Sequence, residues 1–428
     1  MNNHGNATMG KVIATLILLG TCTAVRAEFA IQQIADPDFL NRDPVISETG
    51  IVAWHGMRLQ GAGQRSHVFA HRDGELDILT LNTPTWGNSS LHINGDRITW
   101  VSYLHERGEG RTQDLADPVF DDDDQILDGR WVVAAESGDA PHEQRLIAMG
   151  DPDRAIGDHP LGGRTSPRRG TGDAEIMLWN GDQITRLTVN NLDDQGPVVD
   201  EGLVAWQVGR GWPFGWEIMA WANGTYLQLT TNFYYDMGPQ ISGNQVVWYG
   251  WDGQYNQVFL YDHEAEEITQ LTDTSYNNTG PRISNGVVFW EGLPDAGSDI
   301  FMWRDGEITR LTNNPDDDRN IRTWNGQAVW ESFDGSFFQI YHFDGGEVHQ
   351  LTNTRYDNMQ PDIGEGVITW MGYVDNFDAE IFAWTGGPDP IRLTENDYED
   401  RRPRTAGGRI VWQADDEDAS YIFLAEPR

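Results

Sequence analysis

The chain has 428 residues, a formal net charge of −38 and a single cysteine, Cys22. A negative field of this size repels nucleic acid and other polyanions, so the composition favours cations or neutral molecules as partners. With one cysteine no disulfide can form within the chain, and stability has to come from a packed core. Adaptation to salt and plain solubility are alternative explanations of the acidity.

Residues 1–27 have the pattern of a secretory signal peptide. Lys11 supplies the positive charge, residues 12–19 form a short apolar run, and Ala27 is a small residue suited to cleavage. The apolar run is too short to span a bilayer, and no later stretch is long enough for a transmembrane segment. We therefore expect export to the periplasm, the cell surface or the medium. Lipidation at Cys22 is the less favoured alternative, because the residue before it is not small.

The mature chain, residues 28–428, is organised by an internal repeat. One copy, Pro239–Thr272, reads PQISGNQVVWYGWDGQYNQVFLYDHEAEEITQLT, and similar copies begin at Pro281 and Pro361. The leucines of the closing Leu-Thr pairs are Leu187, Leu229, Leu271, Leu311, Leu351 and Leu393, which are 42, 42, 40, 40 and 42 residues apart. A fixed period of about 40–45 residues with four short strands is typical of a β-propeller blade.

The four strands, a to d in chain order, can be read within one copy. Gln245–Trp248 is β-branched and aromatic, as strands prefer, and the Gly243-Asn244 turn before it folds strand a onto strand b. Val258–Tyr261 forms strand c, and Ile268–Thr272 is a short outer strand d. One such sheet cannot bury both its faces alone, so the copies must stack around a ring.

The strand-b tryptophans set the expected number of blades at eight. They are Trp54, Trp100, Trp206, Trp248, Trp290, Trp330, Trp370 and Trp412. The step between Trp100 and Trp206 is 106 residues and contains an insertion at about 105–173. This insertion is polar enough to be a long loop between strands b and c, but it could contain a degenerate blade. We expect an all-β propeller of eight four-stranded blades, with seven or nine as alternatives.

Closure of the ring is predicted at the chain ends. The last copy ends at Tyr421–Leu424, which is a strand c, and lacks the Leu-Thr strand d. Residues Ala30–Ala35 align without a gap on Glu267–Thr272. The N-terminal strand should therefore complete the C-terminal blade and remove an open sheet edge.

With Pro-x-Ile-Ser-Gly, Val-Val-Trp and Leu-Thr in this order, the copies resemble the TolB-type (PD40, WD40-like) propeller repeats of exported bacterial proteins. The resemblance covers about residues 30–104 and 174–425. The copies are most similar to the arrays in bacterial and archaeal cell-surface proteins. It implies a propeller scaffold with partners in the cell envelope, and it implies no catalytic residues.

Features present in every blade are interpreted as blade-building. The tryptophans should pack between blades. A column of short polar residues also recurs three positions before Pro-x-Ile: Asn41, Asp194, Asp236, Asn278, Asp318, Asn358 and Asp400. Such side chains bond local backbone at turns, and a ring of Ca²⁺ ligands is the alternative.

Function is expected where the repeat breaks, and above all in the b–c loops. These loops are aromatic and acidic, and their candidate ligand-binding residues are Trp212, Phe214, Trp251, Tyr255, Phe337, Tyr373 and Phe377. Aromatic rings beside Asp and Asn suit neutral sugar rings or peptide segments, through stacking and hydrogen bonds. The alternative is that these rings fold onto their own loops.

A further set of candidate metal ligands lies in the insertion. The run Asp121, Asp122, Asp123 and Asp124 could hold Ca²⁺, but it lacks the alternating Asp-x-Asp-x-Asp-Gly spacing, and a solvated acidic run is the favoured interpretation. No cofactor other than a possible Ca²⁺ is implied.

Signals for catalysis are weak. No nucleophile elbow, zinc-protease motif or phosphate-binding loop is present. His55, His67 and His71 cluster in the first copy, but no third ligand for a metal is evident, so we interpret them as structural or solvent-exposed. The sequence therefore predicts a non-catalytic binding scaffold that engages a neutral glycan or an envelope protein through its loop-rich face. The alternative is a propeller-fold polysaccharide lyase or glycosidase, which a basic, histidine-lined cleft would favour.

Overall fold

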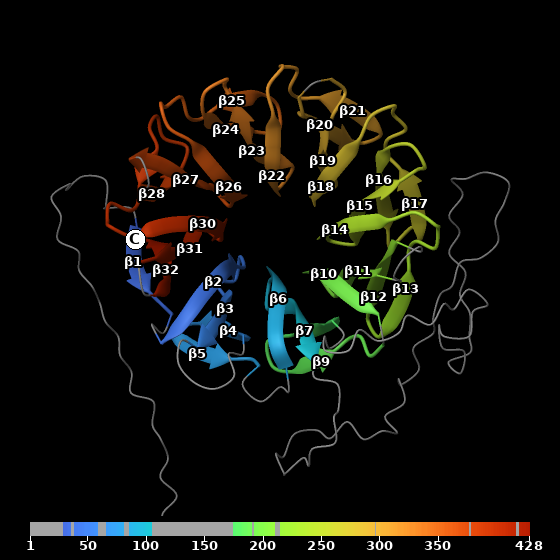
Figure 1. The fold of residues 1–428 in the computed structure, drawn as a ribbon, viewed down its shortest axis with the longest axis horizontal. Helices are drawn as coiled ribbons and strands as arrows, with labels where there is room; N and C mark the ends of the chain where they lie inside the picture. The colour runs from blue at the N-terminus through green and yellow to red at the C-terminus, as the bar shows by residue number, and fades with distance from the viewer. Residues whose placement is uncertain are drawn as a thin grey trace, which may run out of the picture.

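The computed structural model describes residues 29–35, 38–58, 66–80, 85–104, 174–190, 192–209, 215–295, 297–375, 378–416 and 419–428. These residues form strands and turns arranged as a ring of blades around a central axis (Figure 1). The described part of the chain contains no helix that could cross a bilayer. The predicted signal peptide lies outside the described residues.

Each blade is an antiparallel sheet with strand a at the axis and strand d at the rim, as predicted (Figure 1). In blade 1 the strands are β2 (Phe39–Ile46), β3 (Val52–Arg58), β4 (Ser66–Arg72) and β5 (Glu75–Ile78). Blade 2 contains β6 (Thr85–Asn94), β7 (Arg97–Leu104), β8 (Ala174–Trp179) and β9 (Ile184–Arg186). Blade 3 contains β10 (Asp193–Asp200), β11 (Leu203–Gly209), β12 (Trp216–Ala222) and β13 (Thr225–Gln228). Blade 4 contains β14 (Asp236–Ser242), β15 (Gln245–Trp251), β16 (Asn256–Asp262) and β17 (Glu267–Gln270).

The second half of the ring repeats this order. Blade 5 contains β18 (Asn278–Ser284), β19 (Val287–Gly292), β20 (Asp299–Arg304) and β21 (Glu307–Arg310). Blade 6 contains β22 (Asp318–Trp324), β23 (Gln327–Phe333), β24 (Phe338–Phe343) and β25 (Val348–Gln350). Blade 7 contains β26 (Asn358–Gly364), β27 (Val367–Asp375), β28 (Asp378–Trp384) and β29 (Ile391–Arg392). Blade 8 contains β30 (Glu399–Ala406), β31 (Arg409–Asp415), β32 (Ser420–Pro427) and the N-terminal β1 (Phe29–Gln33).

The described residues thus make eight blades, the number expected from the tryptophans, and the alternatives of seven or nine do not describe this part of the chain. Six blades are separate four-stranded sheets. Blades 8 and 1 are joined into one eight-stranded sheet by a single parallel bridge between Leu40 and Ser420. The ring is therefore tied where the two chain ends meet.

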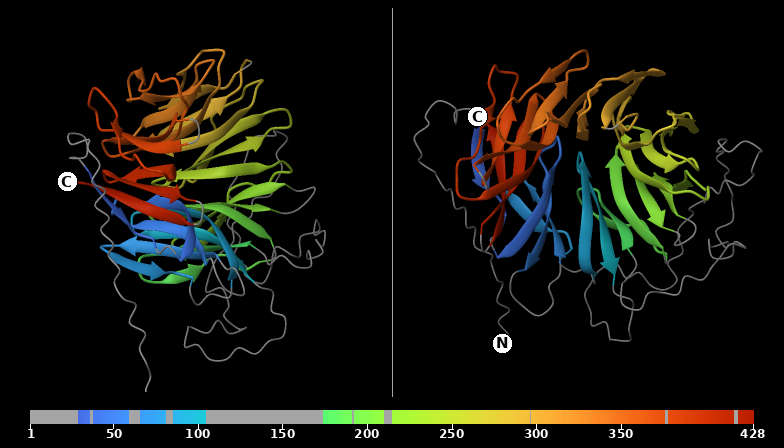
Figure 2. Two further views of the ribbon diagram at one scale, coloured as in Figure 1. Left: turned by 60° about the vertical axis from the view of Figure 1, so that its left-hand side comes forward. Right: turned by 45° about the horizontal axis from the view of Figure 1, so that its top comes forward.

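The N-terminal strand completes blade 8 as predicted, and it does so in the predicted register. Strand β1 lies along β32, beside the C-terminus, in both views of the molecule (Figures 1 and 2). Gln33 pairs with Phe423 as Gln270 pairs with Phe259 in blade 4. The backbone N–H of Ile34 donates to the Ile422 carbonyl at 2.9 Å, in the position of the closing leucine of other blades. The outer edge of blade 8 is therefore covered.

The tryptophan column forms the core between blades, as predicted. All eight described strand-b indoles are fully buried. Most stack on an aromatic ring of strand c; for Trp248 and Phe259 the ring centroids are 5.8 Å apart with an interplanar angle of 12°. Stacked aromatic pairs add packing energy beyond the area that they bury, so the blades that carry such a pair are stabilised in the same way. Opposite Trp100 and Trp206, strand c instead places Met177 and Met219.

The column of Asp and Asn residues accepts the indole N–H groups. Trp206 Nε1 donates to Asp194 Oδ1 at 2.8 Å, and Trp290 Nε1 donates to Asn278 Oδ1 at 2.9 Å. The same bond recurs at Asn41, Asp236, Asp318, Asn358 and Asp400. A buried N–H without a partner is costly, so this column is explained by the tryptophans that it satisfies rather than by a ring of Ca²⁺ ligands.

The long insertion connects two neighbouring strands of blade 2. Strands β7 and β8 pair antiparallel, with Trp100 opposite Met177 and Tyr103 opposite Ala174. Residues 105–173 therefore join strands b and c of one blade. Their own conformation, including that of Asp121–Asp124, lies outside the described residues.

Candidate functional site: the loop face and the central channel

Two kinds of connection, d–a and b–c, emerge on one face of the ring, which we call the loop face. Of the seven aromatic residues predicted on it, Trp251, Tyr255, Phe337 and Tyr373 are described. Trp212, Phe214 and Phe377 lie outside the described residues, as do the candidate metal ligands Asp121–Asp124.

On blade 4, Trp251 belongs to a cluster with three residues of the d–a connection before it. The backbone N–H of Trp251 donates to the Tyr235 carbonyl at 3.0 Å, and the two rings are stacked with centroids 6.1 Å apart. Beside them Phe233 is 71% exposed and Tyr234 is 44% exposed. We call Phe233, Tyr234, Tyr235 and Trp251 the aromatic platform.

The platform is held in place by its neighbours. The Asn232 side chain accepts the N–H of Tyr234 at 2.7 Å and donates to Asp236 at 2.7 Å. A Cβ added at Gly215 would lie 2.9 Å from the Tyr234 carbonyl oxygen, and one at Gly253 would lie 3.0 Å from its hydroxyl. The b–c loops of blades 3 and 4 therefore close on Tyr234 from both sides, at positions where glycine leaves room.

Tyr255 lies on the same b–c loop as Trp251, whereas Phe337 and Tyr373 lie on blades 6 and 7. An Asp side chain caps each of two turns: Asp252 Oδ1 accepts the N–H of Tyr255 at 2.7 Å, and Asp334 Oδ1 accepts the N–H of Phe337 at 2.8 Å. Tyr373 is half-buried on blade 7. The structure thus brings Trp251 together with the platform and does not bring Phe337 or Tyr373 to it.

Sequence reasoning missed Phe233, Tyr234 and Tyr235. The signal was present, because three consecutive aromatic residues stand before Asp236, whereas the described d–a connections of the other blades carry at most one there. This break in the repeat lies in a d–a connection, whereas the seven predicted aromatic residues all belong to b–c loops.

A second break in the repeat lies at the axis, on the inner strands. The residue between Pro and Ile in the repeat is Arg282 in β18 and becomes Arg322, Asp362 and Arg404 in the next three blades. Arg322 Nε lies 3.9 Å from Asp362 Oδ1. Arg282 Nε donates to the Ile321 carbonyl of the next blade at 3.3 Å. We call Arg282, Arg322, Arg404 and Asp362 the channel cluster.

Like charges crowd in this cluster. Burial, followed by the guanidiniums of Arg404 and Arg282, lowers the pKa of Arg322 to about 9. Burial also raises the pKa of Asp362, against the opposing effect of Arg404 and Arg322. Because a guanidinium stays protonated in proteins, the shift at Arg322 expresses first the free-energy cost of burying its charge and then the repulsion of two neighbouring cations.

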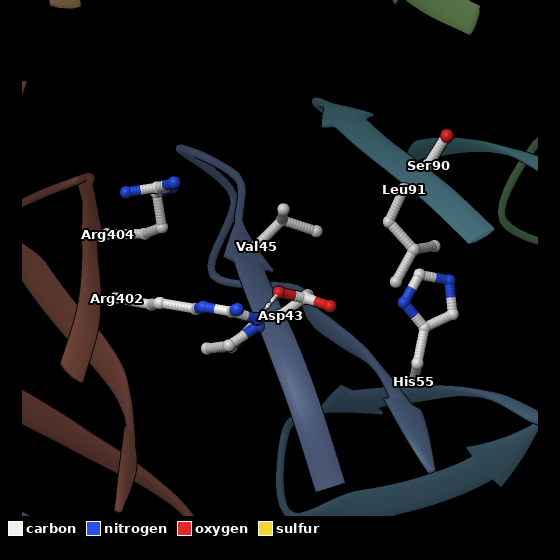
Figure 3. A pocket seen from close by; sticks show the side chains of 8 residues that line it. Asp43, Val45, His55, Ser90, Leu91, Arg402 and Arg404 are labelled. Atoms are coloured by element: carbon white, nitrogen blue, oxygen red, sulfur yellow. Dashed lines mark hydrogen bonds and ion pairs between the residues drawn. The ribbon is translucent and has the colours of Figure 1, made fainter. Parts of the chain in front are cut away.

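A pocket of about 210 Å³ lies beside Arg404, between blades 8, 1 and 2 (Figure 3). It is lined by Asp43, Pro44, Val45, His55, Ser90, Leu91, Arg402 and Arg404. The Arg402 guanidinium reaches across to Asp43 and forms an ion pair with it (Figure 3). Burial lowers the pKa of His55 to about 4, so its imidazole is neutral at physiological pH. The sequence predicts a structural or solvent-exposed role for this histidine, and the structure buries its Nε2 atom.

No protein-family model and no curated protein matches the chain. It is similar to the β-propeller domain of the trilobed protease from Pyrococcus furiosus, with a TM-score of 0.48 and 9% identity over 85% of this chain and 98% of that chain. It is also similar to an acylaminoacyl peptidase from Pyrococcus horikoshii, with a TM-score of 0.44 and 14% identity over 78% of this chain and 50% of that chain. For TolB from Acinetobacter baumannii the TM-score is 0.35, with 13% identity over 60% of this chain and 76% of that chain. These similarities concern the fold, a β-propeller as the TolB-like repeats predict.

Proposed function

We propose that the protein is an exported, non-catalytic binding propeller that engages a neutral glycan or an envelope protein through the aromatic platform of its loop face. The observation that supports this proposal is the exposure of Phe233 and Tyr234, at 71% and 44%, next to the stacked rings of Tyr235 and Trp251. Grouped exposed aromatic side chains are uncommon on a soluble surface and are typical of binding sites.

The chemistry around the platform favours an uncharged partner. Asp252 and Asn232 lie next to the rings and their side chains hold the turns that carry the rings, while the rings themselves can pack on the apolar face of a sugar or on a side chain. A chain with a net charge of −38 attracts no polyanion to this face.

The proposal is tested by binding measurements on platform variants. Phe233→Ala and Trp251→Ala should each weaken binding at least about tenfold, the factor that corresponds to about 1.4 kcal/mol. A glycan array identifies a carbohydrate ligand, and a pull-down from envelope extract with the purified full chain identifies a protein partner. Ile308→Ala, which removes a 49% exposed apolar side chain on the outer strand β21, is the matched control. Unchanged binding by both platform variants would contradict the proposal.

A propeller-fold polysaccharide lyase or glycosidase is the second candidate, and the pocket with His55, Arg402 and Arg404 is the observation in its favour. A neutral imidazole can accept a proton and arginines can bind a uronate carboxylate. This candidate predicts that the purified protein cleaves a polyuronate and that His55→Ala abolishes the cleavage. We rank it second because Arg402 is already paired with Asp43.

A further inference from the structure

The positive charges of the channel cluster are incompletely neutralised. Within the described part of the chain, the one ion pair that the cluster makes is the 3.9 Å contact between Arg322 and Asp362. The neighbouring carboxylate of Glu331 is paired with Arg319, at 2.9 Å. Glu291 acts on Arg282 without lying at ion-pair distance from it. Three guanidiniums therefore share Asp362 and the more distant Glu291, which leaves an excess of positive charge at the axis of a strongly acidic protein.

Most N–H groups of the three guanidiniums also make no hydrogen bond within the described structure. A guanidinium carries five N–H donors. In the described structure each of two arginines donates to the carbonyl of the residue before it: Arg404 to Pro403 at 2.8 Å, and Arg322 to Ile321 at 3.0 Å. Arg282 donates to the same Ile321 carbonyl and to the carbonyl of Pro281. The remaining donors are free to bind an oxyanion, for which the planar guanidinium fork is well suited.

Backbone strain is concentrated on the same side of the channel. In each blade, strand a has one residue in the left-handed region where the register shifts, just before the Pro position, which is Leu91 in blade 2 and Ile321 in blade 6. Three blades place glycine there: Gly196, Gly238 and Gly280. Blades 6, 7, 8, 1 and 2 instead place Asn320, Gln360, Arg402, Asp43 and Ser90 there, with φ between 53° and 59°. A non-glycine residue in this region costs about 1–2 kcal/mol, and such strain is concentrated at functional sites.

These strained side chains build the wall of the pocket beside Arg404. Asp43, Ser90 and Arg402 line it, coming from blades 1, 2 and 8 (Figure 3). His55 enters from the far side, and its Nε2 atom is buried with no hydrogen-bond partner in the described structure. The pocket volume of about 210 Å³ is several times the ~30 Å³ that a water molecule occupies in the liquid, so it can hold a small organic group.

We propose that the channel cluster binds a compact anionic group, a carboxylate or a phosphate, with the uncharged part of the ligand in the pocket that His55 lines. Arg322 and Arg404 hold the oxyanion and Arg282 contributes positive charge from blade 5. At physiological salt the acidic exterior repels anions only within about 8 Å, whereas the buried arginines are screened less and attract them strongly. A small anion therefore feels the repulsion only briefly on its way in, whereas a polyanion would remain in contact with the acidic surface. This site is separate from the aromatic platform and does not depend on the function proposed for it.

The test is calorimetric titration of the full chain with inorganic phosphate and, separately, with propionate, at constant ionic strength maintained with sodium chloride. Saturable binding of either probe with one site per chain supports the proposal. Binding of phosphate alone, or of propionate alone, identifies which oxyanion the site prefers. Absence of saturable binding for both probes would overturn it.

Variants separate a ligand site from a structural cluster. Arg322→Gln and Arg404→Gln should each weaken anion binding at least about tenfold, which corresponds to about 1.4 kcal/mol. In the absence of added anion, both variants should have the same melting temperature as the unmodified chain or a higher one, because they relieve the repulsion between the arginines. Arg322→Lys, which keeps the charge but loses the planar fork, should retain part of the binding. Arg355→Gln, an equal change of charge at an exposed position on the loop face, is the matched control.

The opposite result has a clear form. If Arg322→Gln and Arg404→Gln both lower the melting temperature and leave anion binding as in Arg355→Gln, the arginines tie the blades together and the proposal is wrong. If Arg322→Gln does not fold, the titration of the unmodified chain and of Arg404→Gln decides the matter alone.

Discussion

At the scale of single residues, the buried tryptophan and its oxygen acceptor are the repeated unit of this protein. Trp248 is fully buried, stacks on Phe259, and donates to Asp236 at 3.0 Å. In blade 2 the bond is relayed, since Trp100 donates to Ser102 and Ser102 donates to Asn88. The pattern is retained through these variations because an indole brings a polar N–H into an otherwise apolar core, where it needs an acceptor.

The first prediction follows from this bond. Trp248→Phe keeps an aromatic ring but removes the N–H donor and leaves Asp236 Oδ1 without its partner. We expect the free energy of unfolding in urea to fall by about 2–4 kcal/mol. Trp384→Phe is the control, because Trp384 is only half-buried and donates to an exposed loop carbonyl of Gly387. Equal losses in the two variants would show that the buried bond contributes nothing of its own.

At the scale of elements, the junctions between blades come in two chemical types. In one type an Asp accepts from an Asn four residues earlier and lies near a strand-c carboxylate, as with Asn190, Asp194 and Glu175. In the other type an Asn donates to a Thr four residues earlier, as with Thr274 and Asn278, and strand c supplies Gln257. Donors and acceptors are thus exchanged together, because each buried polar atom must keep a partner.

The acidic junction type predicts a pH dependence. Burial, and after it the carboxylate of Glu175, raises the pKa of Asp194 from its ordinary value to about 7. The folded state then binds a proton that the unfolded state releases between about pH 4 and pH 7. The contribution of Asp194 to stability is therefore complete below about pH 4 and is lost as the pH rises through about 7.

The matching experiment converts this junction to the other type. Asn190→Thr with Asp194→Asn reproduces the Thr274 and Asn278 pair and removes the titrating group. We expect the double variant to gain stability relative to the unmodified chain as the pH rises from 4 to 8, measured by chemical unfolding at each pH. A difference that stays constant over this range, or that shrinks as the pH rises, would contradict the assignment of the raised pKa to Asp194.

At the scale of the whole molecule, the ring depends on the pairing of its two ends. Phe29 and Ala35 are buried, and β1 covers the edge of β32. Without β1 this edge would present unpaired backbone groups to other chains. Closure is therefore both a source of stability and a protection against association.

Deletion of residues 29–35 tests the closure. We expect a lower melting temperature and concentration-dependent association, measured by calorimetry and by light scattering. The control is Ile31→Asn, which alters a 39% exposed side chain of β1 and leaves its backbone pairing in place. A deletion variant as stable and as monodisperse as the control would show that β1 adds nothing to the ring.

The insertion gives a second prediction at this scale. Because β7 and β8 pair directly with one another, replacement of residues 105–173 by a short turn should leave the ring folded with its strand content unchanged. Circular dichroism and thermal unfolding measure this, with the unmodified chain as reference. Loss of cooperative unfolding would show that the insertion is part of the core.

The sequence by itself determined the blades, their number in the described part of the chain and the pairing of the two ends. It could do so because every blade repeats the same local contacts, such as the tryptophan at Trp248 and the Leu-Thr close at Leu271, and because the missing strand of the last blade left one partner for Ala30–Ala35. Only the tertiary structure decided the two sites. Arg282 and Arg404 are far apart along the chain and interact only because the ring turns both toward one axis, and Tyr235 stacks on Trp251 only because two different loops emerge on one face. A repeat specifies how each blade is built, whereas convergence around an axis depends on closing the circle.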